Sequence, residues 1–382
     1  MKKVKLFAAA AVSLALCACS PRSETVGSAE PRVEAVKFYE TLALEEGEEA
    51  YILSARGDEL LVSVYASYPP ESPYFREEGY SFKSSSIFIF NVKTGEKSEI
   101  EEITGDLFVS SGALTDYGFA YISLDMAGYV PSVPGRPCRL TLRKAAEQDD
   151  IHIDLGRRSA DGSIDPRLCA LDNGNVAYIA VSPASYFEFQ IMIAKPDGET
   201  VCVASFEEED GVMVYDCALQ SDGERFIFSV AYADAASGSA VWIGDERGIT
   251  ERIVIEEASY VTFFAPLSDS LLISYSVNDD DPMTETLHKM EVVDYSGQNA
   301  VKSDGDYVRL QSNLEDTVIG IDLHWKPHLL RVTDEGVTVT RLSLPAEPVS
   351  FYPVDANSFY VHYNALKRHG DEDNRALYLL SF

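Results

Sequence analysis

The hydrophobic positions of this chain fall into a short pattern that recurs from Tyr51 to the C-terminus. Each copy has a few apolar residues, a tight polar turn, and then a run of β-branched and aromatic residues. This arrangement predicts an antiparallel strand pair. The copies begin at Tyr51, Gly112, Cys169, Cys217, Phe264, Leu310 and Phe351. Their period of roughly 40 to 60 residues is typical of repeat proteins, in which each copy is one structural unit.

Further strand signals complete each copy into a unit of four strands. A third apolar run, such as Ile87–Val92, leads in most units into a tight turn with glycine, and a fourth run follows, as at Thr200–Ala204. Glycine supplies the positive φ that such hairpin turns require. Four-stranded antiparallel units at this period are the blades of a β-propeller. We therefore predict an all-β propeller with seven blades, and six remain an alternative if two irregular units merge.

The last unit is one strand short, because the chain stops after Leu377–Phe382. A strand-like segment, Val33–Glu40, precedes the first unit. We predict that this segment supplies the missing fourth strand of the last blade, which closes the ring and covers an exposed sheet edge. Residues 33–382 would then form a single propeller domain.

The fourth unit resembles the TolB-type propeller repeat over Leu219–Val230, Ser239–Ile243 and Gly244–Ile253. That repeat carries a Ser-Pro-Asp-Gly-Lys turn, an apolar strand, and a second Asp-Gly turn before Arg-Leu. In this chain Gln220 and Ser221 stand at the Ser and Pro positions. The resemblance implies the fold and leaves the ligand open.

The first residues have the pattern of an export signal. A lysine-rich start, Met1–Lys5, precedes the apolar run Leu6–Leu16, which is too short to span a bilayer comfortably. The run ends in Leu-Cys-Ala-Cys, which resembles the lipobox of bacterial lipoproteins with Cys19 as the lipidated residue. We predict a signal peptide at 1–18 and a flexible tether at 19–32. An ordinary secretory signal is the alternative.

In that lipoprotein family, Ser20 directly after the cysteine favours sorting to the outer membrane. The predicted location is therefore the bacterial cell envelope, with the protein held on the membrane through its lipid. The chain carries 31 Lys and Arg against 62 Asp and Glu, a formal net charge of −31. Such a body repels phosphate backbones, which argues against nucleic acid as a partner.

The remaining cysteines are Cys138, Cys169, Cys202 and Cys217. An exported compartment permits disulfides, so their redox state stays open. Cys169 and Cys217 both precede Ala-Leu, which favours equivalent small core positions in consecutive units. The cysteine spacing is irregular and no Cys-x-x-Cys is present, so we predict no metal site and no cofactor.

The chain has no nucleophile elbow, no P-loop and no His-Glu-x-x-His motif. Its six histidines are dispersed along the sequence. We therefore expect a non-catalytic binding or scaffold module. The alternative is a propeller hydrolase or lactonase, with carboxylates or histidines converging at the axial funnel.

The predicted connections divide into two classes. We label the four strands of a blade A to D in chain order. The A–B and C–D turns are mostly tight, whereas most B–C connections are long and several carry aromatic residues. Exposed aromatics on loops of a rigid scaffold are typical of recognition surfaces. The candidate binding residues are Tyr68, Tyr74, Phe75, Tyr80, Tyr129, Tyr186, Phe187, Trp325 and His369. The expected partner is an envelope protein, a peptide or a glycan. The alternative is that these side chains pack the loops against the blades.

Overall fold

The structure, a computed structural model, describes one compact unit from Pro31 to Phe382. Within that unit the described residues exclude 46, 69–70, 73–81, 127–134, 145–149, 159–166, 183–184, 186, 215–218, 233–237, 278–286, 298–299, 306, 334–335, 345–349 and 364–374. In the described part of the chain, no helix is long and apolar enough to cross a membrane.

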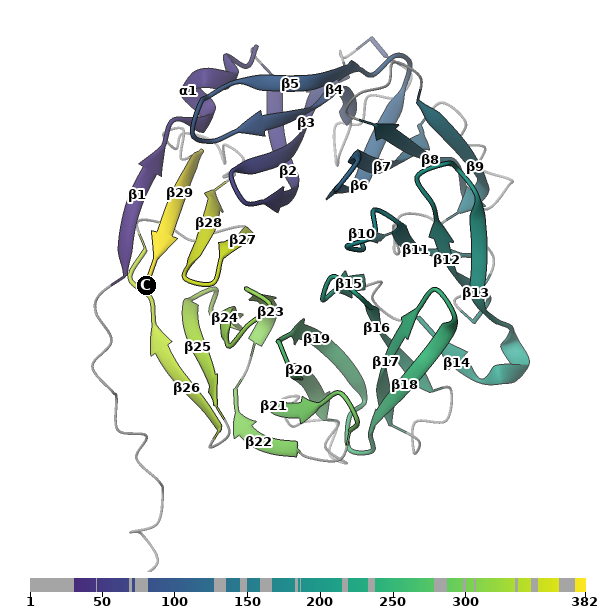
Figure 1. The fold of residues 1–382 in the computed structure, drawn as a ribbon, viewed down its shortest axis with the longest axis vertical. Coiled ribbons are helices and arrows are strands. Elements are labelled where there is room, and N and C mark those ends of the chain that lie inside the picture. The colour runs from purple at the N-terminus through teal and green to yellow at the C-terminus, as the bar shows by residue number, and fades with distance from the viewer. Residues whose placement is uncertain are drawn as a thin grey trace, which may run out of the picture. The chain divides into compact units, whose positions relative to one another are not determined.

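Seven antiparallel sheets are arranged in a ring, as the sequence predicts (Figure 1). Blade 1 contains β2 (Glu48–Arg56), β3 (Glu59–Ser67), β4 (Phe82–Asn91) and β5 (Lys97–Glu102); blade 2 contains β6 (Leu107–Thr115), β7 (Gly118–Asp125), β8 (Arg136–Lys144) and β9 (Ile151–Arg158); blade 3 contains β10 (Leu168–Ala170), β11 (Val176–Val181), β12 (Phe189–Ala194) and β13 (Thr200–Phe206). A single 3₁₀ turn, η1 (Glu208–Asp210), follows blade 3.

The second half of the ring continues the same order from the axis outward. Blade 4 contains β14 (Val212–Met213), β15 (Leu219–Ser221), β16 (Phe226–Tyr232), β17 (Ser239–Asp245) and β18 (Gly248–Ile255); blade 5 contains β19 (Tyr260–Pro266), β20 (Ser270–Val277), β21 (Leu287–Asp294) and β22 (Ala300–Asp304); blade 6 contains β23 (Tyr307–Ser312), β24 (Thr317–Asp322), β25 (Pro327–Thr333) and β26 (Gly336–Arg341); blade 7 contains β27 (Ser350–Asp355), β28 (Ser358–Tyr363), β29 (Ala376–Ser381) and β1 (Arg32–Val36). Blade 4 differs because its inner strand is split into β14 and β15, which both pair with β16.

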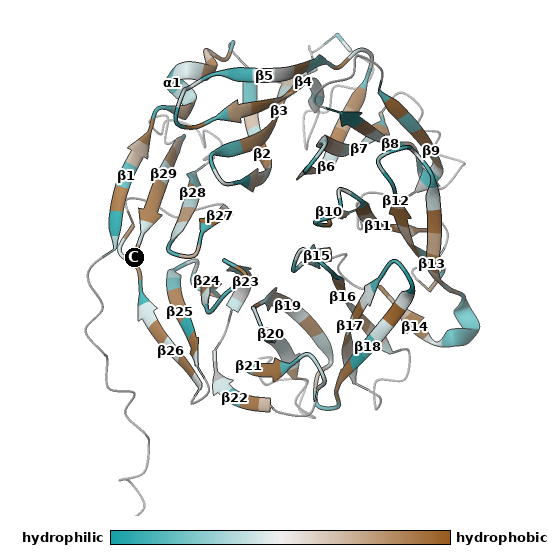
Figure 2. Cartoon of the chain, viewed as in Figure 1, coloured by the Kyte–Doolittle hydropathy of each residue, from teal (hydrophilic) through white to brown (hydrophobic). Residues whose placement is uncertain are grey.

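The hydrophobic core lies between the blades. The second strand of each blade is packed on both faces, so that all of β11 (Val-Ala-Tyr-Ile-Ala-Val) is buried, whereas the outer strand β13 is only half-buried or exposed. Figure 2 shows hydrophobic residues along strands all around the ring, on outer as well as middle strands. Seven hydrophobic clusters of the described residues each join two neighbouring blades. Burial at these seven junctions stabilises the ring.

The N-terminal strand closes the ring. β1 pairs with β29 from Arg32 opposite Ser381 to Val36 opposite Leu377. This confirms the predicted origin of the fourth strand of the last blade. The structure differs after Val36, where residues 38–42 form the short helix α1 (Phe38–Leu42) instead of continuing the strand to Glu40.

The helix replaces the predicted strand because of packing between blades 7 and 1. Phe38 and Leu42 lie one helical turn apart and are both buried in the cluster that joins these two blades. The ammonium group of Lys97 donates a hydrogen bond of 3.0 Å to the carbonyl oxygen of Leu42, at the C-terminus of the helix. A positive charge at the C-terminus of a helix stabilises that end of the helix.

The connections segregate to two faces of the ring, as predicted. The B–C connections of six blades are long, at 68–81, 126–135, 182–188, 233–238, 278–286 and 364–375. The A–B connections of blades 1, 2 and 7 have only two residues each between their strands, at 57–58, 116–117 and 356–357. We call the side with the B–C connections the long-loop face and the opposite side the short-turn face. The connection of blade 6, residues 323–326, is a tight turn on the long-loop face.

Candidate functional site

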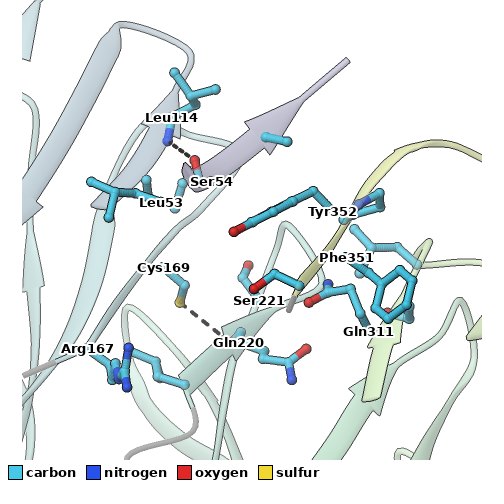
Figure 3. A pocket seen from close by; sticks show the side chains of 18 of the residues that line it. Leu53, Ser54, Leu114, Arg167, Cys169, Gln220, Ser221, Gln311, Phe351 and Tyr352 are labelled. Atoms are coloured by element: carbon cyan, nitrogen blue, oxygen red, sulfur yellow. Dashed lines mark hydrogen bonds between the residues drawn. The ribbon is translucent and has the colours of Figure 1, made fainter. Parts of the chain in front are cut away.

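A cavity of about 720 Å³ lies on the axis of the ring. Its lining comes from the innermost strands of all seven blades, namely β2, β6, β10, β15, β19, β23 and β27, together with adjoining residues. Figure 3 shows side chains from several of these strands around the space, among them Ser54, Cys169, Ser221, Gln311 and Tyr352. A hollow of this volume suits a small ligand or the end of a larger one.

The inner strands have one edge that no further strand covers, so side chains from neighbouring blades satisfy part of this edge. The contacts are Leu114 N–H to Ser54 Oγ (2.9 Å), Leu168 N–H to Ser111 Oγ (3.3 Å), Cys169 Sγ–H to Gln220 O (3.5 Å), Gln220 Nε2–H to Phe264 O (2.6 Å), Asn313 Nδ2–H to Ala356 O (2.6 Å) and Tyr352 Oη–H to Ile52 O (2.6 Å). Each joins one blade to the next. These polar side chains around the axis are therefore used, at least in part, to hold the ring together.

The charged residues among the described lining are Arg167 and Arg309. Arg167 directly precedes β10, and Arg309 lies near the start of β23. Inner strands run from the long-loop face toward the short A–B turn. Both arginines therefore lie at the end of the cavity that opens toward the long-loop face.

Arg309 contacts one aromatic side chain, Trp325, and acts electrostatically on a second, Tyr352. Its guanidinium carbon lies 5.7 Å from the centre of the Trp325 ring, within the range of a cation–π contact. Burial raises the pKa of the Tyr352 phenol to about 12, although the nearby positive charge of Arg309 acts to lower it. Arg309 therefore connects the rim of the cavity, at Trp325, with its interior, at Tyr352.

Trp325 has an unusual backbone conformation. It lies in the turn between β24 and β25 with a φ of +60°, and its side chain is 48% exposed. Bulky residues rarely adopt the left-handed region, because Cβ approaches the backbone there. A second hollow, of about 410 Å³, adjoins this tryptophan on the outer side and includes Lys326 and Arg341.

The structure describes three of the nine candidate binding residues from the sequence. Trp325 is exposed, Phe187 is half-buried in the B–C connection of blade 3, and Tyr68 is only 4% exposed. The burial of Tyr68 fits the packing alternative for that residue. The predicted lipidation site Cys19 lies outside the described residues. So do the other candidate binding residues, which are Tyr74, Phe75, Tyr80, Tyr129, Tyr186 and His369.

The predicted equivalence of Cys169 and Cys217 is wrong. Cys169 lies one residue from the end of its inner strand, where it pairs with Ala177. The corresponding position in blade 4 is occupied by Gln220, which pairs with Ile227. Cys169 is half-buried and lines the axial cavity instead of filling a core slot. The motif Cys-Ala-Leu occurs at both Cys169 and Cys217, but the copy at Cys217 lies farther ahead of the A–B turn of its blade.

Within the described residues, no group of three or more His, Cys, Asp or Glu side chains is placed to hold a metal ion. Two of the histidines in this part have local partners. His328 Nε2 lies 2.9 Å from the Asp322 carboxylate, and His362 is buried against Tyr39. The redox state of Cys217 lies outside the described residues.

Sequence reasoning missed Arg167 and Arg309, although a weak signal was available. Each arginine is followed by a leucine in an inner strand: Leu168 pairs with Tyr178, and Leu310 pairs with Gly320. Each leucine stands three residues before the residue whose amide closes the A–B turn. The two arginines therefore occupy equivalent positions in blades 3 and 6, which only an alignment by turn closure would reveal.

Comparison with known proteins shows similarity of fold. No protein-family model matches the chain, and no curated protein matches its sequence. The propeller domain of the trilobed protease from Pyrococcus furiosus is 9% identical with a TM-score of 0.54, and the match covers 88% of this chain and 94% of that one. A chain of the mitotic checkpoint complex is 11% identical with a TM-score of 0.50, and the match covers 95% of each chain.

The Pyrococcus domain is described as having an open velcro topology, whereas in this chain β1 pairs with β29 inside blade 7. At these identities the likeness establishes the architecture and leaves the ligand open. The chain is a seven-bladed β-propeller closed by its N-terminal strand.

Proposed function

We propose that this protein is a non-catalytic binding module of the bacterial cell envelope, anchored through a lipid on Cys19. Its partner is an envelope protein, a peptide or a glycan, which it recognises on the long-loop face around the mouth of the axial cavity. The observation that carries the proposal is Trp325, a large aromatic residue that is both exposed and held at a φ of +60°. Backbone strain of about 1 kcal/mol or more is commonly retained where function requires it.

The surroundings of Trp325 support a recognition role. The ring lies over Arg309 on the axial side, and the second hollow, with Lys326 and Arg341, lies on the other side. Tryptophan and arginine are the residue types that most often dominate binding energy in protein interfaces. We call Trp325, Lys326 and Arg341 the blade 6 rim.

The lining of the axial cavity favours binding over hydrolysis. Its described residues offer hydroxyl, amide, thiol and guanidinium groups, and Asp, Glu and His are not among them. A glycoside hydrolase would use two carboxylates about 5 to 10 Å apart. The hydrolase alternative from the sequence therefore has no support from the described residues at the axis.

Partner capture tests the recognition surface. The lipidated full-length protein is incubated with a detergent extract of the cell envelope, crosslinked and recovered, and each captured protein or glycan is quantified. The test variant is Trp325→Asn, because asparagine tolerates the left-handed region and removes only the ring. The matched control is Tyr117→Ala, since Tyr117 is 53% exposed on the short-turn face.

We expect Trp325→Asn to reduce capture of the specific partner about ten-fold or more, as is typical for loss of a central aromatic anchor. Tyr117→Ala should leave capture unchanged. Equal capture by Trp325→Asn and the wild type would refute the proposed surface. The anchor is tested separately, because incorporation of labelled palmitate should be lost in Cys19→Ser.

A further inference from the structure

The axial cavity has a charge opposite to that of the whole protein. Acidic residues outnumber basic ones two to one in the sequence, 62 against 31, yet the charged members of the described lining are both arginines. No described residue forms an ion pair with Arg167. Because a hollow lined by protein screens charge less than open water, the guanidinium groups attract an anion that enters it.

The two arginines face the axis from well-separated sides. Blades 3 and 6 have two blades between them on one side of the ring and three on the other (Figure 1). Since Arg167 and Arg309 occupy equivalent positions in these blades, they lie at the same depth, near the long-loop mouth. Deeper in the cavity, toward the short-turn face, the lining includes the apolar residues Leu114, Leu314 and Pro353.

We propose that the axial cavity binds a small organic anion, whose carboxylate or phosphate groups contact Arg167 and Arg309. This rests on the proposed function, because it names the ligand class for the same face. Guanidinium groups bind both kinds of oxyanion with charge-assisted and often bidentate hydrogen bonds. The deeper end of the cavity, where Ser54 and Ser221 stand beside these apolar residues, accommodates an uncharged part of the ligand.

The charge of the protein selects for a small ligand. A body with a net charge of −31 repels a large polyanion along its whole length. A small anion instead meets the local field of two arginines once it reaches the mouth. Trp325 positions Arg309 there through its ring contact at 5.7 Å.

Isothermal titration calorimetry on the full-length protein tests the site with two probes, glutarate and inorganic phosphate. Glutaramide serves as the neutral counterpart of glutarate. The variants are Arg167→Gln and Arg309→Gln. The matched control is Arg331→Gln, which removes the same charge from an exposed position in β25 outside the axial cavity.

We expect saturable binding of at least one anionic probe, none of glutaramide, and a loss of ten-fold or more in affinity in each of the two cavity variants. Arg331→Gln should bind as the wild type does. The stronger probe then identifies a carboxylate or a phosphate ligand. Absence of binding by both probes, or binding that survives both cavity variants, overturns the proposal. Neither result affects partner capture through Trp325, so the two proposals fail separately.

Discussion

Closure of the ring should depend on pH through His362. This side chain lies on β28 at the junction of blades 7 and 1 and is only 2% exposed. Its Nε2 lies 2.6 Å from the hydroxyl of Tyr39 in α1, and the two rings stack with centres 6.0 Å apart. Burial lowers the pKa of His362 from 6.5 to about 4. The imidazole is therefore neutral in the folded protein under most conditions.

The sign of the effect follows from this lowered pKa. Above about pH 6.5, His362 is neutral in both the folded and the unfolded protein, so it adds no pH dependence. Between about 6.5 and 4 the unfolded chain binds a proton that the folded protein does not. The free energy of unfolding therefore falls as the pH falls through this window. The full loss is about 3 kcal/mol, and about 2 kcal/mol of it is reached at pH 5.

Urea unfolding at about pH 7.5 and about pH 5.0 measures this loss in the wild type and in His362→Gln. Glutamine cannot titrate, so this variant should lose about 2 kcal/mol less than the wild type between the two conditions. Carboxylates contribute equally to both proteins and cancel in the comparison. His324→Gln, at an exposed position, serves as the control and should behave as the wild type. Equal pH dependence in the wild type and His362→Gln would show that His362 does not cause the loss of stability.

Two further predictions concern the same junction. Deletion of residues 1–36 removes β1 and should lower the free energy of unfolding by about 3 kcal/mol, because Val33 and Val36 lose their packing and β29 becomes an open edge. Deletion of residues 1–30 is the control. Equal stability of the two truncated proteins in urea would contradict this prediction. Tyr352→Phe should cost about 1 kcal/mol, because the 2.6 Å hydrogen bond to the carbonyl of Ile52 is lost; an unchanged urea midpoint would show that this bond does not stabilise the closure.

The blades could be predicted from the sequence because their signals are local. A tight turn between two runs of β-branched and aromatic residues identifies a strand pair wherever it occurs. The closing strand was also accessible, since the last unit lacked a partner for its edge. Helix α1 was not, because Phe38-Tyr39-Glu40-Thr41-Leu42 has the composition of a strand. Its conformation depends on packing between blades that are distant in sequence.

The axial site depends on contacts that no single segment reveals. Arg167 and Arg309 lie three blades apart along the chain and are brought to one cavity by the ring arrangement. The cysteine alignment failed for a related reason. The A–B turn of blade 3 occupies 171–175 and that of blade 4 occupies 222–225, so matching letters does not match positions.

Hydrogen–deuterium exchange of the protein, alone and with its captured partner, tests most directly whether the long-loop face is the binding surface. We predict slower exchange at residues 323–326 and at the starts of the inner strands near Arg167 and Arg309. The A–B turns of the short-turn face, such as 116–117 and 356–357, should exchange as in the free protein. Protection confined to those turns, with none at 323–326, would show that the partner does not bind at the long-loop face.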